Sequence, residues 1–357
     1  MNILLVAPYL ALTYGGTSKS VRELATTIGN TGTNVDLVTT NANGKAKLDV
    51  PVNLWLSQET YRVRYFPCWN QEDFIISPAL LSWLVRNLHR YDIVHTNTIF
   101  APSISLTHWL CRLQNLPYIA TPHGMLEPWA LSYKTSKKRL YYHLIEKPLL
   151  TQAEAIQTLA HSEAKNLNAL GYQQTIVIPN GIHRQDFETL PSPEDFYQQF
   201  PETRHKTLIL FLGRIDPKKG LDLLAPAFAQ VRDRFWEAHL VVAGPDSIGF
   251  LPTVRTYFRK AGCLEAVTFT GMLGGSLKYA AFTAASIYVA PSYSEGFSMS
   301  ILEGMASGLP CIFTTSCNFS EAAAANAAHV VDVNTNAIAE ALMECFSQPR
   351  EAQAMGD

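Results

Sequence analysis

Two glutamates, Glu295 and Glu303, stand in an E-x7-E spacing late in the chain. The apolar run Ile287–Ala290 just before them predicts a strand buried on both faces. From Ser298 the apolar spacing becomes helical, and Gly308 predicts the end of that helix. The sequence therefore places one carboxylate in the loop at the carboxyl end of a strand and the other in the helix that follows.

The start of this helix is an expected anion site. The backbone amides of Phe297, Ser298 and Met299 would be free donors there, and a helix N-terminus stabilises an anion such as a diphosphate. Side chains on a helix lean toward its N-terminus, so Glu303 could reach groups held at that point. Carboxylates beside an anion are better acceptors for hydroxyls than charge partners. A sugar nucleotide offers hydroxyls on both sides of its diphosphate.

A second set of charged residues follows another predicted strand, Thr207–Leu212. Its exit loop carries Arg214 and Lys219 before a helix. Arginine offers a rigid fork and lysine a compact charge, and both suit a group with about two negative charges. A charged surface turn is the simpler alternative.

These stretches resemble the retaining glycosyltransferases of family four, the glycogen-synthase-like enzymes. The resemblance rests on P-S-x-x-E-G-F with E-x7-E, on G-R-x4-K-G, and on the P-N-G-I turn at Pro179–Ile182. It implies an α/β protein of the GT-B fold, with two Rossmann-like, doubly wound parallel-sheet domains facing across a cleft. Residues 1–190 would bind the acceptor and residues 191–357 the sugar nucleotide.

The resemblance also implies roles for particular residues. Arg214 and Lys219 would stabilise the departing diphosphate, Glu303 would hold the ribose, and Glu295 would hold hydroxyls of the sugar. His123, in a T-P-H-G-M stretch at the end of a predicted strand, would orient the sugar from the first domain. Further donor contacts are implied for Gly15, Gly16, Met272, Leu273, Gly296, Phe297, Ser298, Met299 and Leu302. The departing phosphate would accept the proton of the acceptor.

Alternating strand and helix signals support two parallel sheets. In the first half, strands are predicted at Asn2–Ala7, Val35–Thr39, Val63–Phe66, Asp92–His95, Tyr118–Thr121, Ala153–Gln157 and Thr175–Ile178. The turn with Gly15 and Gly16 precedes a predicted helix, but no G-x-G-x-x-G is present, so a dinucleotide site is not supported. His95 also ends a strand, and a structural role is as good an expectation for it as a ligand contact.

The sequence also makes predictions about the segments that connect or follow these elements. The polar, proline-bearing stretch Pro191–His205 is the expected linker between the domains. Thr314, Thr315 and Glu321 match the family pattern, but Asn318-Phe319 replaces its usual pair of glycines, so we expect that loop to differ in shape. The family usually continues past a stretch such as Glu351–Gly356 into helices that return to the first domain. We expect that return segment to be absent.

Composition limits the class of protein. Nearly half of the 357 residues are hydrophobic and the net charge is −2, which favours a globular enzyme and gives no argument for a nucleic-acid partner. Six scattered cysteines fit reduced thiols in the cytoplasm. Neither a leader nor a membrane span is predicted. We find no clustered metal ligands, so we expect no metal and no cofactor beyond the donor substrate.

The stretch Tyr133–Leu150 predicts an amphipathic helix with a basic, tyrosine-bearing face. Such a face could rest on the inner surface of an anionic membrane or meet a polyprenyl-diphosphate acceptor. A solvated charged face is the favoured alternative. A cytoplasmic protein, with peripheral membrane contact as an additional hypothesis, is the expected location.

The function predicted from these observations is retaining hexosyl transfer from a UDP-sugar, with UDP-glucose as the first expectation. The acceptor would be a glycan or a lipid-linked glycan in exopolysaccharide biosynthesis. Three alternatives stay open at this point: a sugar-nucleotide epimerase of the same fold, a retaining glycoside hydrolase that uses Glu295 and Glu303, and an inactive, transferase-like binding protein. The hydrolase would need its two carboxyl groups about 5 Å apart and no diphosphate site.

Overall fold

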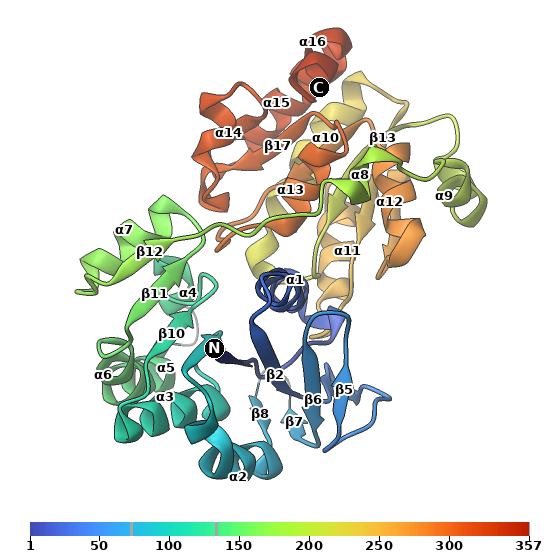
Figure 1. Ribbon diagram of the computed structural model, residues 1–357. Coiled ribbons are helices and arrows are strands. Elements are labelled where there is room, and N and C mark those ends of the chain that lie inside the picture. The colour runs from blue at the N-terminus through green and yellow to red at the C-terminus, as the bar shows by residue number, and fades with distance from the viewer. Residues whose placement is uncertain (72–73, 133–134, 357) are drawn as a thin grey trace. The chain divides into compact units, whose positions relative to one another are not determined.

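The computed structural model describes residues 1–71, 74–132 and 135–356, and it divides into two compact units. The first unit is Met1–Gly181 and the second is Ile182–Asp357. The division falls a few residues before the boundary of 190 expected from the sequence. Each unit is built on its own parallel sheet, with helices on both faces (Figure 1).

The first unit contains twelve of the described strands. They are β1 (Asn2–Val6), β2 (Asn34–Thr40), β3 (Ala42–Asn43), β4 (Ala46–Lys47), β5 (Trp55–Ser57), β6 (Arg62–Phe66), β7 (Trp69–Gln71), β8 (Phe74–Ile76), β9 (Ile93–Asn97), β10 (Tyr118–Thr121), β11 (Ala155–Thr158) and β12 (Thr175–Val177). Eight form one sheet in the order β12-β11-β10-β9-β1-β2-β6-β5, in which only β5 runs antiparallel to its neighbour. The pairs β3–β4 and β7–β8 are separate antiparallel hairpins.

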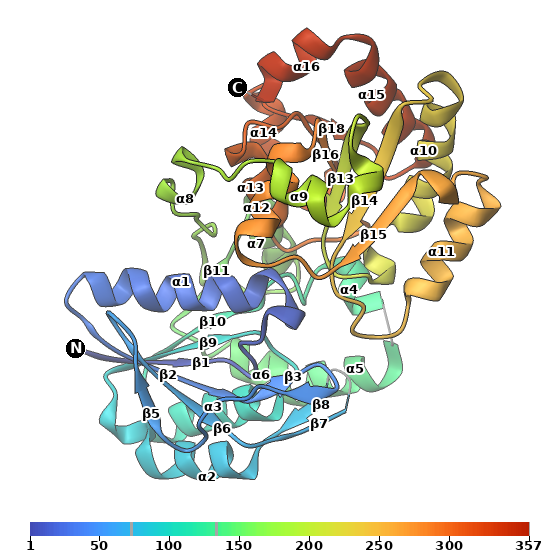
Figure 2. The same ribbon diagram turned by 90° about the vertical axis from the view of Figure 1, so that its right-hand side faces the viewer.

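The helices of the first unit cover both faces of this sheet. They are η1 (Leu12–Tyr14), α1 (Gly16–Asn30), α2 (Pro78–Asn87), η2 (Leu88–Arg90), α3 (Pro102–Gln114), α4 (Pro128–Ser132), α5 (Thr135–Tyr141), the π-helix η3 (Tyr142–Glu146), α6 (Lys147–Leu150) and α7 (His161–Ala169). Figure 2 shows α1 over one face and α2 and α3 over the other. Side chains alternate along β1, so Ile3 and Leu5 pack on the α1 side and Leu4 and Val6 on the opposite side.

The second unit has a fully parallel sheet in the order β15-β14-β13-β16-β17-β18. Its strands are β13 (Thr207–Leu212), β14 (Ala238–Ala243), β15 (Val267–Gly271), β16 (Ile287–Ala290), β17 (Cys311–Thr314) and β18 (His329–Val331). Its helices are α8 (Gln185–Glu188), α9 (Glu194–Gln199), η4 (Pro201–Thr203), η5 (Pro217–Lys219), α10 (Leu221–Arg234), α11 (Leu251–Lys260), η6 (Leu264–Ala266), α12 (Gly275–Ala284), α13 (Met299–Ala306), η7 (Thr315–Cys317), α14 (Ser320–Ala324), α15 (Thr335–Ser347) and α16 (Pro349–Gly356).

The prediction that Pro191–His205 is a linker between the domains is wrong. This stretch forms α9 and η4, and the fully buried Phe196 packs with Phe200 into the core of the second unit. Two aromatic side chains at helical spacing bury enough apolar area to fix a segment that is otherwise polar. The stretch is part of the second unit and not a free connection.

The predicted helix Tyr133–Leu150 is divided in the structure. Tyr133 and Lys134 lie outside the described residues, and the chain from Thr135 to Leu150 is helical in three consecutive segments, α5, η3 and α6. Leu140, Leu144 and Ile145 are exposed on it. No helix within the described residues has the length and apolar character needed to cross a membrane. All six cysteines are buried free thiols.

Candidate active site

The second unit brings Lys219 and Glu295 together at the point where its strand order reverses. Strands β13 and β16 are neighbours, and chain connections leave this pair in opposite directions, which is where open α/β sheets bind ligands. Lys219, in the loop after β13, donates a 2.5 Å hydrogen bond from Nζ to Oε1 of Glu295 in the loop after β16. Ser292 Oγ donates to the same oxygen at 2.7 Å. The Nζ of Lys218 lies 4.0 Å from Oε2.

The electrostatics of Glu295 are set by this pairing. The residue is 7% exposed, and burial by itself raises the pKa of a carboxyl group. The charges of Lys219 and Lys218, with the hydrogen bonds from Lys219 and Ser292, outweigh burial and lower the pKa of Glu295 to about 2. Glu295 is therefore ionised at neutral pH. Burial lowers the pKa of Lys218, an effect that the charge of Glu295 opposes.

Backbone contacts fix the two loops against each other. Tyr293 donates its amide N–H to the carbonyl oxygen of Lys218 at 2.7 Å. Gly220 has a φ of +68°, and a Cβ built on it would lie 1.9 Å from the carbonyl oxygen of Pro291. Only glycine fits this close approach and this backbone conformation.

A third loop supports Glu295 from the other side. The Glu295 amide donates to the carbonyl oxygen of Ser316 at 2.9 Å, and Asn318 Nδ2 donates to the carbonyl oxygen of Glu295 at 2.6 Å. Asn318 has a φ of +56°, in the left-handed region that asparagine tolerates better than most residues. The Asn318-Phe319 pair thus supplies the positive φ that a glycine would, and it adds a hydrogen bond to the site.

Arg214 lies in the same exit loop and is held less firmly. Its Nη2 lies 3.8 Å from Oδ2 of Asp216, while Oδ1 of Asp216 accepts a 3.0 Å hydrogen bond from the Lys218 amide. About a quarter of the Arg214 side chain is exposed (26%). A loosely paired, partly exposed guanidinium can still turn to a bound anion.

Helix α13 begins as the sequence predicts. Ser298 is its N-cap without a side-chain capping bond, and no acceptor for the amides of Phe297, Ser298 or Met299 is found among the described residues. Gly296 precedes this turn, and the Phe297 ring packs on Phe319 at 5.4 Å. These amides meet the condition for an anion site at a helix N-terminus.

Glu303 has a lysine partner that sequence reasoning missed. It is 3% exposed on α13 and accepts a 2.7 Å hydrogen bond from Nζ of Lys278 on α12. Leu302 is partly exposed beside it. Met272 and Leu273 follow β15 at the same edge of the sheet, and Met272 is 48% exposed. Both glutamates are therefore charge partners of the protein's own lysines.

The first unit holds the remaining predicted site residues, Gly15, Gly16 and His123. Gly15, with a φ of +81°, is the N-cap of α1, and Gly16 is the first residue of that helix. His123 follows β10 with a φ of +53°, and its Nε2 lies 3.0 Å from Oδ1 of Asn97 at the end of β9. Burial, followed by the charge of His95, lowers the pKa of His123 to about 3. The imidazole is therefore neutral at pH 7.

The strained turn at His123 is held by Glu163, a second residue that sequence reasoning missed. Its Oε1 accepts from the Gly124 amide and its Oε2 from the Leu159 amide, each at 2.7 Å. Glu163 is buried at the third position of α7, where an acidic side chain commonly reaches back to a preceding backbone amide. His95 is buried, and its Nε2 lies 2.7 Å from Thr121 Oγ1, which supports the structural alternative for it.

Within the part of the chain that the structure describes, no group of three or more histidine, cysteine, aspartate or glutamate side chains could hold a metal ion.

Comparison with known proteins agrees with this arrangement. The family model for Glycosyltransferase Family 4 matches residues 14–186, and the model for Glycosyl transferases group 1 matches residues 194–357. Similar sequences include a phosphatidyl-myo-inositol mannosyltransferase of Mycobacterium leprae, 27% identical over 87% of this chain and 78% of that protein. An alpha-monoglucosyldiacylglycerol synthase of Streptococcus pneumoniae is 26% identical over 83% of this chain and 67% of that protein.

Solved structures show the same fold. The sucrose-phosphate synthase from Thermosynechococcus elongatus has a TM-score of 0.80 at 21% identity, covering 100% of this chain and 92% of that one. HepE from Anabaena, in complex with UDP and glucose, has a TM-score of 0.79 at 17% identity, covering 100% and 93%. With a family four domain followed by a group 1 domain on two Rossmann-like sheets, this chain is a glycosyltransferase of the GT-B superfamily.

Proposed function

We propose that this glycosyltransferase transfers a hexosyl group from a UDP-sugar, with UDP-glucose as the first candidate, and retains the anomeric configuration. The acceptor would be a glycan or a lipid-linked glycan in exopolysaccharide biosynthesis. One observation carries the proposal: the start of α13, whose amides have no acceptor among the described residues, lies at the same sheet edge as Arg214, Lys218 and Lys219. This combination suits a diphosphate.

The charges in the site support binding without a metal ion. Three cationic side chains in one loop can balance the roughly two negative charges of a diphosphate. Lys219 already has an anionic partner in Glu295, so the diphosphate would share Lys219 with that carboxylate. A solved relative of this fold, HepE from Anabaena, has been crystallised with UDP and with UDP-glucose, which supports a uridine nucleotide as the donor.

The state of the two glutamates argues against the hydrolase alternative. A retaining hydrolase needs a carboxylic acid whose pKa is raised so that it can protonate the leaving group. The pKa of Glu295 is lowered to about 2 and Glu303 is paired with Lys278, so neither matches that role. In transfer, the bond between the sugar and the diphosphate breaks, the acceptor oxygen bonds to the sugar on the same face, and the departing phosphate takes the acceptor proton.

A lipid-linked acceptor and a peripheral location at the inner face of the membrane belong to the same proposal. Two similar proteins are named for transfer to phosphatidyl-myo-inositol and for synthesis of a glucosyldiacylglycerol. The exposed Leu140, Leu144 and Ile145, with the exposed Arg139 beside them, provide apolar and basic groups suited to a membrane surface.

The test has two stages. A thermal-shift panel of UDP, GDP and ADP and of their glucose and mannose derivatives identifies the donor, since a ligand at about 100 times its Kd adds roughly 2.7 kcal/mol of stability. Arg214→Ala should lose the shift, and Arg259→Ala, which removes an exposed arginine from α11, should keep it.

Product analysis follows with the donor that binds, a lipid-linked glycan and EDTA. The coupling constant of the new anomeric proton reports the configuration. A product with inverted configuration, or activity that EDTA abolishes, would refute the retaining or the metal-free part of the proposal. Epimerised donor in the absence of acceptor would favour the epimerase.

A further inference from the structure

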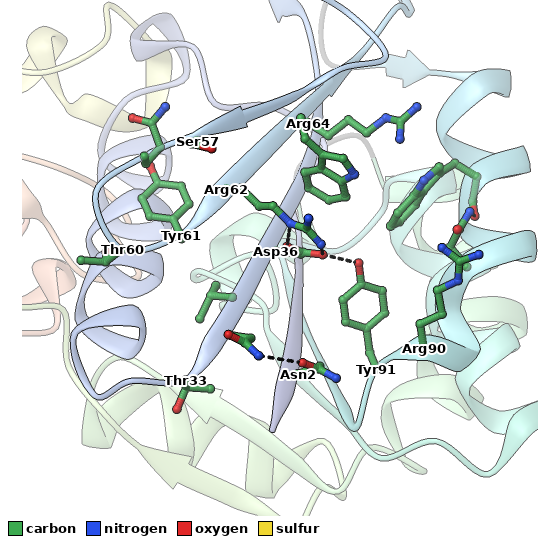
Figure 3. Close-up of a pocket in the computed structure, with 16 residues that line it drawn as sticks. Asn2, Thr33, Asp36, Ser57, Thr60, Tyr61, Arg62, Arg64, Arg90 and Tyr91 are labelled. Atoms are coloured by element: carbon green, nitrogen blue, oxygen red, sulfur yellow. Dashed lines mark hydrogen bonds and ion pairs between the residues drawn. The ribbon is translucent and has the colours of Figure 1, made fainter.

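A cavity of about 680 Å³ lies in the first unit (Figure 3). It is lined by Asn2, Asn34 and Arg62, the first residues of β1, β2 and β6. Gly15 and His123 follow the carboxyl ends of β1 and β10. Parallel strands present their amino ends at one edge of a sheet and their carboxyl ends at the other. The cavity therefore lies at the sheet edge opposite to the one that carries the predicted transfer residues.

The floor of the cavity is electrically neutral. Asp36 on β2 accepts two hydrogen bonds from Arg62, at 2.5 Å from Nε and 2.8 Å from Nη2. The hydroxyl of Tyr91 donates to Oδ2 of the same carboxylate at 2.6 Å. Figure 3 shows the Arg62 and Tyr91 side chains converging on Asp36. Asp36 is the ion-pair partner of Arg62 and the hydrogen-bond acceptor of Tyr91. No other carboxylate is among the described residues that line the cavity.

Two further arginines, Arg64 and Arg90, also line the cavity. Among the described residues, neither Arg64 on β6 nor Arg90 on η2 has an ion pair or hydrogen-bond acceptor. The Nε of Arg64 is buried and unsatisfied. A buried donor without an acceptor is unfavourable in the folded state. The lining thus has two positive charges without an ionic partner among the described residues.

Aromatic rings hold these guanidinium groups and add flat apolar surface. The guanidinium carbons of Arg62 and Arg64 lie 4.5 Å and 5.8 Å from the ring centre of Trp55, and Arg64 also lies 5.2 Å from that of Phe66. Trp83 meets Trp55 edge to face at 5.9 Å. Stacking of this kind restrains the arginine side chains.

Polar side chains complete the lining. Ser57, Gln58, Thr60 and Asn87 supply hydroxyl and amide groups that can both donate and accept. A pyranose ring presents C–H groups on its faces, which suit partly exposed tryptophan rings, and hydroxyls at its edge, which suit amides. Guanidinium forks add selectivity for an acidic substituent.

We propose that this cavity is a second saccharide site, which binds a sugar bearing a carboxylate or a phosphate. It would anchor an acidic residue of a glycan at the amino ends of β1, β2 and β6. The inference does not depend on the proposed transfer reaction, because saccharide binding here requires neither donor nor catalysis. Failure of the transfer assay and failure of this binding assay are therefore separate results.

Saturation-transfer NMR on the full chain tests the proposal with D-glucuronate and glucose 6-phosphate as probes. D-Glucose is the control for the sugar ring without a charge, and inorganic phosphate is the control for the charge without a sugar ring. Both acidic sugars should bind more tightly than either control, with the same affinity in saturating UDP. Arg64→Gln and Arg90→Gln should each weaken binding by about 10- to 150-fold, as expected for a charge-assisted bond. Trp55→Ala should weaken binding of the acidic sugars more than binding of phosphate, because it removes the ring surface for the sugar as well as the stacking on the two arginines.

Matched control variants separate a loss of binding at this cavity from a general effect of removing an arginine. Arg112→Gln removes an exposed arginine from α3 and should change nothing. Arg90 is itself exposed, so its variant should fold even if the Arg64 variant does not. Equal binding of phosphate and the acidic sugars would show a simple anion site and overturn the proposal. Competition by UDP would overturn the proposal in favour of a donor site. Co-sedimentation of the wild type, but not of the two glutamine variants, with phosphatidylglycerol vesicles would overturn it in favour of a lipid surface.

Discussion

Lys219 and Glu295 form a buried ion pair across the two loops that follow β13 and β16, with Nζ and Oε1 2.5 Å apart. The Lys219 side chain is 12% exposed and that of Glu295 is 8% exposed. The sequence interpretation gave Lys219 to the donor diphosphate and Glu295 to the sugar. Each is the other's partner in the structure, so a diphosphate bound to Lys219, as proposed, would share or redistribute this charge.

The first prediction concerns this pair. Lys219→Met leaves a buried carboxylate with only Lys218 nearby, and removing one partner of a buried pair typically costs about 3–5 kcal/mol. Lys219→Met/Glu295→Gln removes both charges and should recover much of the lost thermal stability, measured by calorimetry. Lys260→Met, at an exposed lysine of α11, is the control. Additive losses in the double variant would mean that the two residues are not energetically coupled.

The second prediction separates the two glutamates. Glu303→Gln should weaken UDP binding by about 10- to 150-fold, since a charge-assisted bond to the ribose contributes about 1.5–3 kcal/mol. Glu295→Gln should keep or raise UDP affinity, because it removes a negative charge near the diphosphate and frees Lys219, but it should cripple transfer. Titration calorimetry and turnover are the measurements. If Glu295→Gln weakened UDP binding and Glu303→Gln did not, the roles assigned to the two glutamates would have to be exchanged.

The third prediction is a pH dependence that originates at Glu163. Burial raises the pKa of Glu163 to about 7, although the amides of Leu159 and Gly124 oppose the rise. An acid whose pKa is higher in the folded state binds more protons there, so its contribution to stability is full below about pH 4.5 and declines up to about pH 7.

The difference in melting temperature between the wild type and Glu163→Gln should therefore decrease over that range and then level off. Glu154→Gln, which removes an exposed carboxyl group of the same unit, is the control variant. A difference that grows as pH rises from 4.5 to 7 would contradict the assigned pKa.

The fourth prediction concerns Asn97 and His123. Asn97→Asp places a carboxylate 3.0 Å from Nε2 of the ring and favours the imidazolium, which should move the pKa of His123 upward from about 3 by about 1 to 3 pH units. An NMR titration of the ring protons reports it, with His239 in the second unit as the control. If the His123 resonance does not respond, the two side chains are not in contact in solution.

The sequence predicted the main strands of the two sheets well, but it did not predict side-chain contacts between residues far apart in the chain. Apolar runs such as Ile287–Ala290 and Thr207–Leu212 have few alternatives to a buried strand, and both are confirmed. The pairing of Lys278 with Glu303 joins two helices and leaves no local pattern, so sequence reasoning missed it. Glu163 could have been found, since an acidic residue at the third helical position is a known capping signal.

The wrong linker has a different cause. The stretch from Pro191 to His205 is judged polar by composition, but Phe196 and Phe200 stand four residues apart, and that spacing predicts one buried helical face. Composition averaged over a window hides two aromatic residues that decide where a segment packs. The short strands β3, β4, β5, β7 and β8 were missed because two or three residues give too little periodicity to recognise.

The contact between Gly220 and Pro291 limits how this enzyme can be recombined with its relatives. Because a Cβ at position 220 would lie 1.9 Å from the carbonyl oxygen of Pro291, each loop is shaped to the backbone of the other and not only to its side chains. A chimera that imports residues 213–220 from a homologue should therefore keep glycine at position 220 or exchange residues 291–296 with it. A graft that brings a side chain to position 220 should disrupt the native packing of the two loops.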